Sequence, residues 1–184
     1  MLRGTVVTLR PVREDDLAEL YAHHVDIDNR GEYFPRGIVA QTRFVKEFHE
    51  SGFWTKDEGM LVIVNPDAQI IGHIEFFKTV NYLAEYELSY ILYGTEHRRQ
   101  GAMTEAVTLM VRYLFETKPM NRIRLVIHPG NTASRRIAEK CGFRPEGTAR
   151  GAWYNAGRYQ DVEIYAILHH DVIGRSRPDQ AAEA

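Results

Sequence analysis

The residues best suited to chemistry form a short basic segment, residues 98–104, which reads RRQGAMT and precedes an apolar helical run. The first turn of a helix has backbone N–H groups without intrahelical partners, and the helix dipole adds about half a positive charge there. Gly101 has no Cβ to obstruct an approaching phosphate. The preceding residues 86–93 read YELSYILY, which is typical of a strand. The segment therefore predicts a strand–loop–helix unit that binds phosphate.

The same residues exclude two common kinds of phosphate site. The segment lacks the Gly-Lys-Ser/Thr ending of a P-loop, and it does not follow the pattern G-x-G-x-x-G. We therefore expect neither a nucleoside triphosphate nor a dinucleotide as the ligand. A solvated charge pair without a ligand is the alternative for Arg98 and Arg99.

A second segment, residues 131–147, reads NTASRRIAEKCGFRPEG. Residues 98–104 resemble the R-x-x-G-x-A pyrophosphate loop of GNAT-superfamily N-acetyltransferases, and residues 131–147 resemble their N-x-x-S…K-x-G-F-x-x-E-G segment. The opening Leu-Arg-Pro at 9–11 and the late Tyr-Gln-Asp at 159–161 make the chain most similar to the ribosomal-protein N-terminal (RimJ/RimL-type) branch. The resemblance covers about residues 5–171. Met103 stands where the family usually has Ala or Gly, so we expect a more crowded loop.

The resemblance implies transfer of an acetyl group from acetyl-CoA to a primary amine, by direct attack and without a covalent enzyme intermediate. The acceptor is then a protein N-terminus or a small-molecule amine, and a homodimer is one assembly that the resemblance allows. The implied contacts to the cofactor come from the strand, the basic segment and the second motif, at Ile91, Leu92, Arg98, Arg99, Gln100, Gly101, Ala102, Met103, Thr104, Asn131, Ser134 and Arg136.

Glu87 is the predicted general base. An alkyl amine is mostly protonated at neutral pH, so a carboxylate or a water chain must remove a proton before attack. Relatives often carry a carboxylate on the strand before the phosphate loop, and alternation places Glu85, Glu87 and Ser89 on one face of it. The alternative is a structurally paired acid. Residues 150–154, where some relatives have a carboxylate, contain none, and Asp161 is expected to be structural.

Ser134 is the residue predicted to assist the leaving CoA sulfur. It follows Asn131 by three residues, so both lie on the same side of the first helical turn. Asn131 is expected to bind the cofactor, to cap the helix, or both. Capping alone is the alternative for both residues, because Asn, Thr and Ser are ordinary at a helix start.

Composition narrows the class of protein. A chain of 184 residues fits one domain, and a net charge of −2 does not favour nucleic acid or a membrane as a partner. The single cysteine, Cys141, excludes an intramolecular disulfide framework, and the absence of H-x-x-x-H and C-x-x-C spacing predicts no metal site. No apolar run approaches the roughly 18 residues of a membrane span. We expect a cytoplasmic protein.

Periodicity predicts a single α+β domain over residues 1–173. Its core would be a mixed, mostly antiparallel central sheet with helices on both faces, and residues 174–184 are expected to be a disordered tail. Residues 26–37 are expected to form a loop. The expected helices span 13–25, 42–51, 102–116 and 132–140, and the expected strands span 5–10, 59–64, 70–79, 84–93, 122–127, 143–153 and 159–168.

Two other functions are compatible with the same residues. One is a non-catalytic sensor that binds acyl-CoA, and the other is an interaction protein whose site has decayed. Release of CoA with a panel of amines would separate a catalyst from a sensor, and failure to bind CoA would identify the decayed site.

Overall fold

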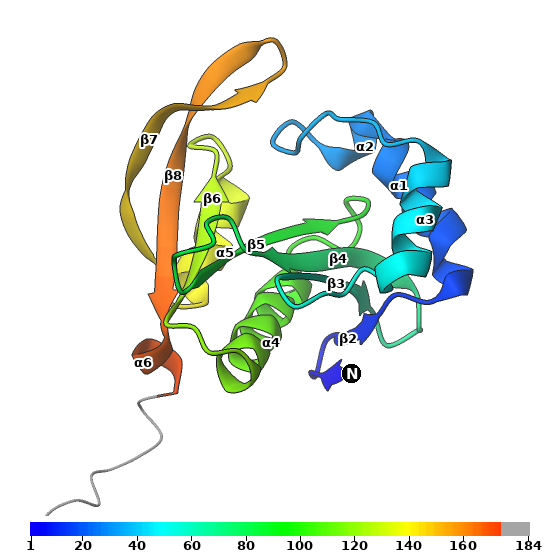
Figure 1. The fold of residues 1–184 in the computed structure, drawn as a ribbon, viewed down its shortest axis with the longest axis horizontal. Coiled ribbons are helices and arrows are strands. Elements are labelled where there is room, and N and C mark those ends of the chain that lie inside the picture. The colour runs from blue at the N-terminus through cyan, green and yellow to red at the C-terminus, as the bar shows by residue number, and fades with distance from the viewer. Residues whose placement is uncertain (174–184) are drawn as a thin grey trace, which may run out of the picture.

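The computed structural model describes residues 1–173, so the predicted tail at 174–184 lies outside the described residues. Its centre is an eight-stranded sheet in the order β1-β2-β3-β4-β5-β6-β8-β7, antiparallel except between β5 and β6 (Figure 1). The strands are β1 (Leu2–Arg3), β2 (Thr8–Pro11), β3 (Glu58–Val64), β4 (Ile70–Phe77), β5 (Glu85–Leu92), β6 (Arg122–Ile127), β7 (Arg144–Asn155) and β8 (Arg158–Leu168).

Helices cover both faces of this sheet, so the predicted fold class is confirmed. Four differences from the sequence prediction are local. A two-residue strand, β1, precedes the first expected strand, and a 3-10 turn precedes the first helix. A short helix interrupts the expected loop at 26–37, and one more short helix follows β8. The elements are η1 (Glu14–Asp16), α1 (Leu17–Val25), α2 (Ile27–Arg30), α3 (Gln41–Ser51), α4 (Ala102–Thr117), α5 (Thr132–Lys140) and α6 (His169–Val172).

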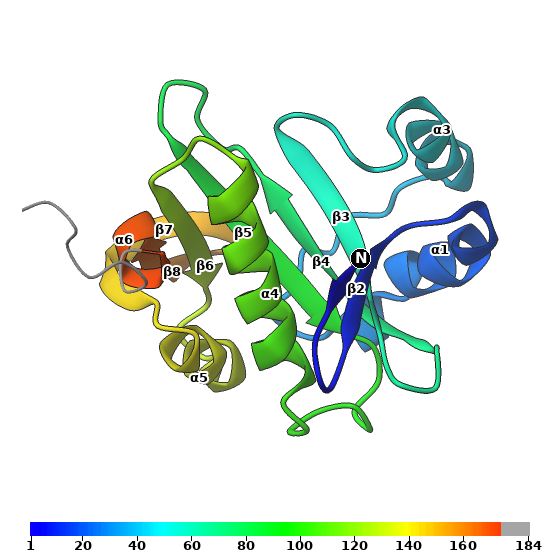
Figure 2. The ribbon, with the colours of Figure 1, turned by 90° about the horizontal axis from the view of Figure 1, so that it is seen from below.

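Successive side chains of the strands alternate between two hydrophobic cores, one on each face of the sheet. On β3, Leu61 and Ile63 are buried with α4 on one face, while Val62 and Val64 are buried with α1 and α3 on the other. This alternation is the period-two pattern of a strand that is covered on both sides. Figure 2 shows α4 crossing one face of the sheet, with α1 and α3 to the side of β2 and β3.

The parallel pair β5–β6 is short. Its register joins Glu85 to Arg122, Tyr86 to Ile123 and Glu87 to Arg124, and the pairing ends there. Beyond it, β5 continues its ladder with β4 and β6 continues with β8. The two halves of the sheet therefore separate from residue 88 onward, directly before the predicted phosphate segment, and we call this gap the splay.

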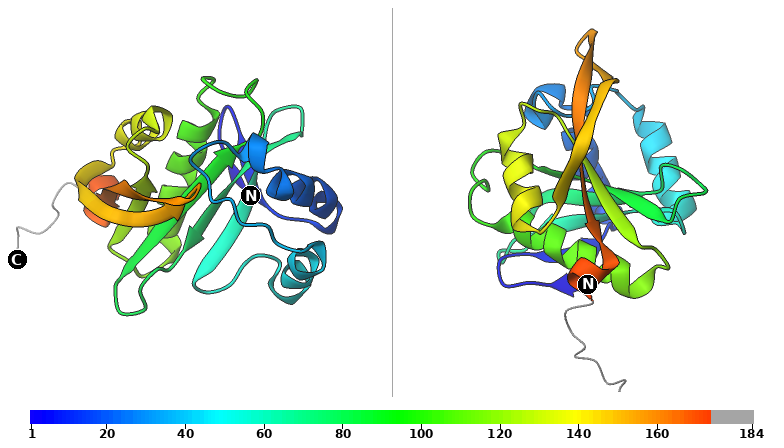
Figure 3. Two further views of the ribbon diagram at one scale, coloured as in Figure 1. Left: turned by 90° about the horizontal axis from the view of Figure 1, so that it is seen from above. Right: turned by 90° about the vertical axis from the view of Figure 1, so that its left-hand side faces the viewer.

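A long hairpin and one loop frame the open end of the splay. Strands β7 and β8 rise beyond the rest of the sheet as an arm, on the side opposite α1 and α3 (Figures 1 and 3). The loop after α2 reaches across: the Tyr33 ring stacks on His128 at a centroid distance of 4.8 Å, and Asn155 Nδ2 donates to the Glu32 carbonyl. The fold thus brings segments more than 90 residues apart together around the splay.

Candidate functional site

The predicted phosphate segment forms the turn between β5 and α4. Gly101 is the N-cap residue of α4 with φ of +85°, and no side chain caps this helix end. A Cβ at Gly101 would meet no heavy atom within 4 Å, so the space in front of the helix is open. Arg98 and Arg99 are exposed, and Gln100 Nε2 donates to the Glu96 carbonyl at 2.7 Å. The free N–H groups and the basic side chains suit an anion.

Met103 does not crowd this turn. Its side chain is 4% exposed and packs in the core beneath the sheet, as does that of Ala102. The expected crowding is therefore wrong, because the helix turns residue 103 toward the core instead of the loop. Only the backbone of these two residues faces the space in front of α4, where amide groups are the parts that bind phosphate.

The second motif forms the start of α5. Asn131 is the N-cap, and its Oδ1 accepts from the backbone N–H of Ser134 at 3.1 Å. The Ser134 side chain lies against the Tyr90 hydroxyl of β5 closely enough to lower that phenol's pKa, although burial dominates and raises it overall. The Tyr90 hydroxyl is buried and has no well-formed hydrogen bond among the described residues. Tyr90 was missed in the sequence because its strand position resembles ordinary core.

Glu87 is part of an ion-pair network at the closed end of the splay. Arg124 Nη2 lies 2.9 Å from Glu87 Oε2, and Arg124 Nη1 lies 3.4 Å from Glu85 Oε1. Arg122 binds Glu85 at 2.8 Å and also pairs with Glu146 of β7. Burial raises the pKa of Glu87, and Arg124 partly offsets this. The network joins β5, β6 and β7 where the parallel pairing ends.

A second acidic residue, Glu75 of β4, lies on the α1 and α3 side of the sheet. Its side chain is 31% exposed, and Oε1 is 3.4 Å from His73 Nε2. His73 Nδ1 is 2.6 Å from the Tyr93 hydroxyl, and the His23 ring stacks on Tyr93 at 3.8 Å between centroids. Burial raises the pKa of Glu75 to about 7 and, together with nearby cationic groups, lowers that of His73 to about 3.

Glu75 and its neighbours were missed by the sequence reasoning. The available signal was a carboxylate, two residues after a histidine, inside a strand that is otherwise apolar. The charge of Arg30 in α2 acts on Glu75 and partly offsets the rise in its pKa, while the Arg30 guanidinium lies over the Phe34 ring at 4.8 Å. Nothing in the local sequence at 26–37 indicates that this segment would lie over β4.

The remaining predicted residues are placed as follows. Ile91 is 9% exposed and packs in the core beside α1 and α3, whereas Leu92 packs against the opposite core. Arg136 is exposed on α5. Cys141 is half-buried, its Sγ donates to the Thr104 carbonyl at 3.5 Å, and burial raises the pKa of its thiol.

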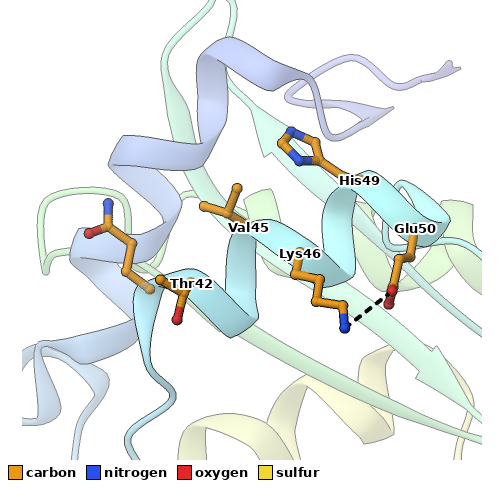
Figure 4. A pocket seen from close by; sticks show the side chains of 6 residues that line it. Thr42, Val45, Lys46, His49 and Glu50 are labelled. Atoms are coloured by element: carbon orange, nitrogen blue, oxygen red, sulfur yellow. Dashed lines mark ion pairs between the residues drawn. The ribbon is translucent and has the colours of Figure 1, made fainter.

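A surface pocket lies elsewhere, along the outer side of α3 (Figure 4). None of its lining residues was predicted to act, and it includes the exposed ion pair between Lys46 and Glu50. Within residues 1–173, no group of three or more His, Cys, Asp or Glu side chains could hold a metal ion. None of the described helices is long and apolar enough to cross a membrane.

A sheet that splays next to an uncapped helix N-terminus defines a class of acyltransferase fold. Residues 7–144 match the family model described as an acetyltransferase (GNAT) domain, and the chain belongs to this family. The protein is an acetyl-CoA-dependent N-acetyltransferase that acts on amines, as the resemblance in the sequence implied.

Three curated relatives show the range of the family around this chain. A probable N-acetyltransferase, YjcK of Bacillus subtilis, is 27% identical over 93% of this chain and 98% of its own length. The spermidine N(1)-acetyltransferase of Vibrio cholerae is 28% identical over 92% of this chain and 97% of its own. The alanine N-acetyltransferase of ribosomal protein uS5 in Escherichia coli is 28% identical over 75% and 70%, respectively.

Solved structures share the fold. The crystal structure of the Vibrio cholerae spermidine N-acetyltransferase in complex with CoA and spermine has a TM-score of 0.80, covers 92% of this chain and 99% of its own, and is 20% identical. A GNAT-family acetyltransferase from Bacillus anthracis has a TM-score of 0.76 at 22% identity, over 92% of this chain and 98% of its own.

Proposed function

We propose that acetyl-CoA binds with its pyrophosphate at the N-terminus of α4 and its pantetheine arm in the splay between β5 and β6. The amine then attacks the thioester directly from the side of α1 and α3. The observation that carries this proposal is the end of β5–β6 pairing at Glu87 and Arg124, immediately before an uncapped, glycine-led helix start. The polar groups of the pantetheine arm can hydrogen-bond to backbone N–H and C=O groups of a strand only where the neighbouring strand no longer pairs with them.

The class of acceptor amine follows from the residues on the α1 and α3 side of the sheet, which we call the acceptor side. The charges of Glu47 and Glu58 both raise the pKa of Glu75 there, so this side of the sheet favours a cationic group. Both a polyamine and a protein N-terminus carry such a charge, as do the acceptors named for the relatives. Ser134 stays the predicted proton donor to the leaving thiolate, as the sequence suggested. A panel that includes both acceptor types, scored by CoA release, tests the assignment.

Replacing Gly101 by Ala tests the proposed phosphate site. At φ of +85° an L-residue is strained by about 1–2 kcal/mol, so the turn should relax away from the conformation that presents its N–H groups. Acetyl-CoA affinity should then fall about 5- to 30-fold in calorimetry. Gly157→Ala is the matched control, since Gly157 has φ of +79°, also faces open space, and lies in the β7–β8 turn. Equal affinities for the two variants would contradict the site.

A further inference from the structure

Glu75 occupies the position on the sheet that an incoming amine would reach. In the antiparallel register of β4 and β5 it lies directly opposite Ser89, two residues past the end of the β5–β6 pairing, while Glu87 lies opposite Phe77. Directly opposed residues share a face of the sheet. Glu75 is therefore beside the start of the splay, on the side away from α4.

The carboxylate of Glu75 is free of a direct cation. Arg124 contacts Glu87 through two nitrogens, but no Lys or Arg of residues 1–173 lies within 4.0 Å of Glu75. The charged groups that face Glu75 are Arg30 from α2, Glu47 from α3 and Glu58 from β3. A cationic amine would thus meet a carboxylate that has no competing ion pair.

We propose that Glu75 accepts the proton of the acceptor ammonium, the role that the sequence assigned to Glu87. The inference rests on the proposed function, because it requires acetyl-CoA in the splay. The Glu75 carboxylate takes one proton from R–NH₃⁺ and becomes a carboxylic acid, which leaves a neutral amine. A base with a pKa near the operating pH combines the required charge state with sufficient proton affinity.

The remaining steps balance without a further reactant. The amine nitrogen forms a bond to the thioester carbonyl carbon, and the C–S bond breaks as the thiolate leaves. The nitrogen loses a second proton, which neutralises the thiolate, while Glu75 returns its own proton to water. The products are the amide, CoA thiol and one released proton.

His73 and Tyr93 are positioning residues for this carboxylate. The low pKa of His73 keeps its ring neutral, and burial raises the pKa of Tyr93 so that its hydroxyl stays protonated. In the tautomer that we assign to His73, the Tyr93 hydroxyl donates to Nδ1 and the ring proton is on Nε2, which lies 3.4 Å from Glu75 Oε1. The arrangement orients one carboxylate oxygen and leaves the other for the amine.

The test compares Glu75→Gln with Glu87→Gln, the same change one strand away, and with Glu116→Gln on α4 as an exposed control. Two acceptors are used, an alkyl amine that the wild type acetylates and its analogue with a trifluoromethyl group on the carbon that bears the amine, which is mostly neutral at pH 7.5. With the alkyl amine, Glu75→Gln should lower kcat about 10²- to 10⁴-fold. It should also remove the acid limb of the pH–kcat profile, which is the fall in kcat as the pH drops below about 7. Acetyl-CoA Kd should stay within about twofold, and the fluorinated amine should restore turnover.

Several results would overturn the proposal. These are a wild-type acid limb in Glu75→Gln, loss of activity that the fluorinated amine does not rescue, or the rescue pattern in Glu87→Gln instead. A wild type that binds acetyl-CoA but acetylates no amine would refute the proposed function itself, and the proposal with it.

Tyr93→Phe gives a second test that does not depend on how Glu75→Gln folds. It keeps the ring against His23 but removes the donor to His73 Nδ1, so the other tautomer can turn a bare Nε2 toward Glu75. The acid limb of kcat should then move to higher pH, because the charged carboxylate loses a donor. An unchanged profile would contradict the positioning role.

Discussion

Replacing Arg124 by Met should destabilise the fold by removing a cation that two poorly exposed carboxylates share. The Glu87 and Glu85 side chains are 16% and 7% exposed, and Arg124 lies 2.9 and 3.4 Å from them. Methionine keeps an unbranched chain and removes the charge. Glu85 retains Arg122 at 2.8 Å, so the loss falls mainly on Glu87.

The size of the effect follows from burial. Removing one partner of a buried ion pair costs roughly 3–5 kcal/mol. The Arg124 side chain is 24% exposed, so solvent screening lowers the expected cost to about 2–3 kcal/mol. In a domain of this size 1 kcal/mol corresponds to roughly 2–4 °C, so the thermal midpoint should fall by about 4–12 °C.

The pH dependence and a double variant make this prediction specific. Burial already raises the folded-state pKa of Glu87, and removing Arg124 raises it further. A carboxyl group with a raised folded-state pKa does not lower stability while it is protonated in both the folded and the unfolded state. The loss of stability develops as pH rises above the unfolded-state pKa and through the folded-state pKa. The free energy of unfolding in urea should therefore differ little between Arg124→Met and wild type at about pH 4, and should differ by the full amount at pH 8.

Arg124→Met is also made in a Glu87→Gln protein, in which residue 87 carries no charge that could be left unpaired. In that background Arg124→Met should cost at most half as much, because the neutral glutamine side chain has no charge to leave unpaired. Equal costs in both backgrounds, without dependence on pH, would refute the ion-pair account and leave packing as the cause.

Two further predictions concern α4 and α5. Ser134→Ala should lower turnover by about 100-fold or less. Its folded fraction should stay normal, because the Asn131 cap accepts from the backbone N–H of residue 134, which alanine keeps. Tyr90→Phe is the control, and wild-type turnover in Ser134→Ala would assign the leaving-group role to another residue. Glu105→Gln should destabilise by about 1–3 kcal/mol, since Glu105 accepts from three backbone N–H groups of residues 5–7. These bonds outweigh desolvation and lower the Glu105 pKa, so urea unfolding should show the difference above its unfolded pKa and lose it as pH falls through the folded one.

Local signals in the sequence predicted the elements and the cofactor side of the site. The Gly101 turn and the Asn131 cap depend on a few neighbouring residues, because φ preference and helix capping act within one turn. The period-two and helical patterns predicted the strands and the longer helices to within a few residues. The structure added only short elements, such as α2 and α6, whose four residues are too few to show a period.

The acceptor side was decided by tertiary structure. Glu75, His73 and Tyr93 come from two strands, and their relation follows from the β4–β5 register, which pairs His73 with Ile91 and Glu75 with Ser89. Arg30 comes close enough to act on them electrostatically only because the segment after α1 folds over the sheet. The sequence predicted Glu87 as the base but gave no sign of its ion-pair partner Arg124, which is 37 residues away and becomes adjacent through parallel pairing. Local sequence determined which turns and helices form, whereas the charge state and partners of each carboxylate depend on long-range packing, because burial and neighbouring charges shift a pKa only after distant strands meet.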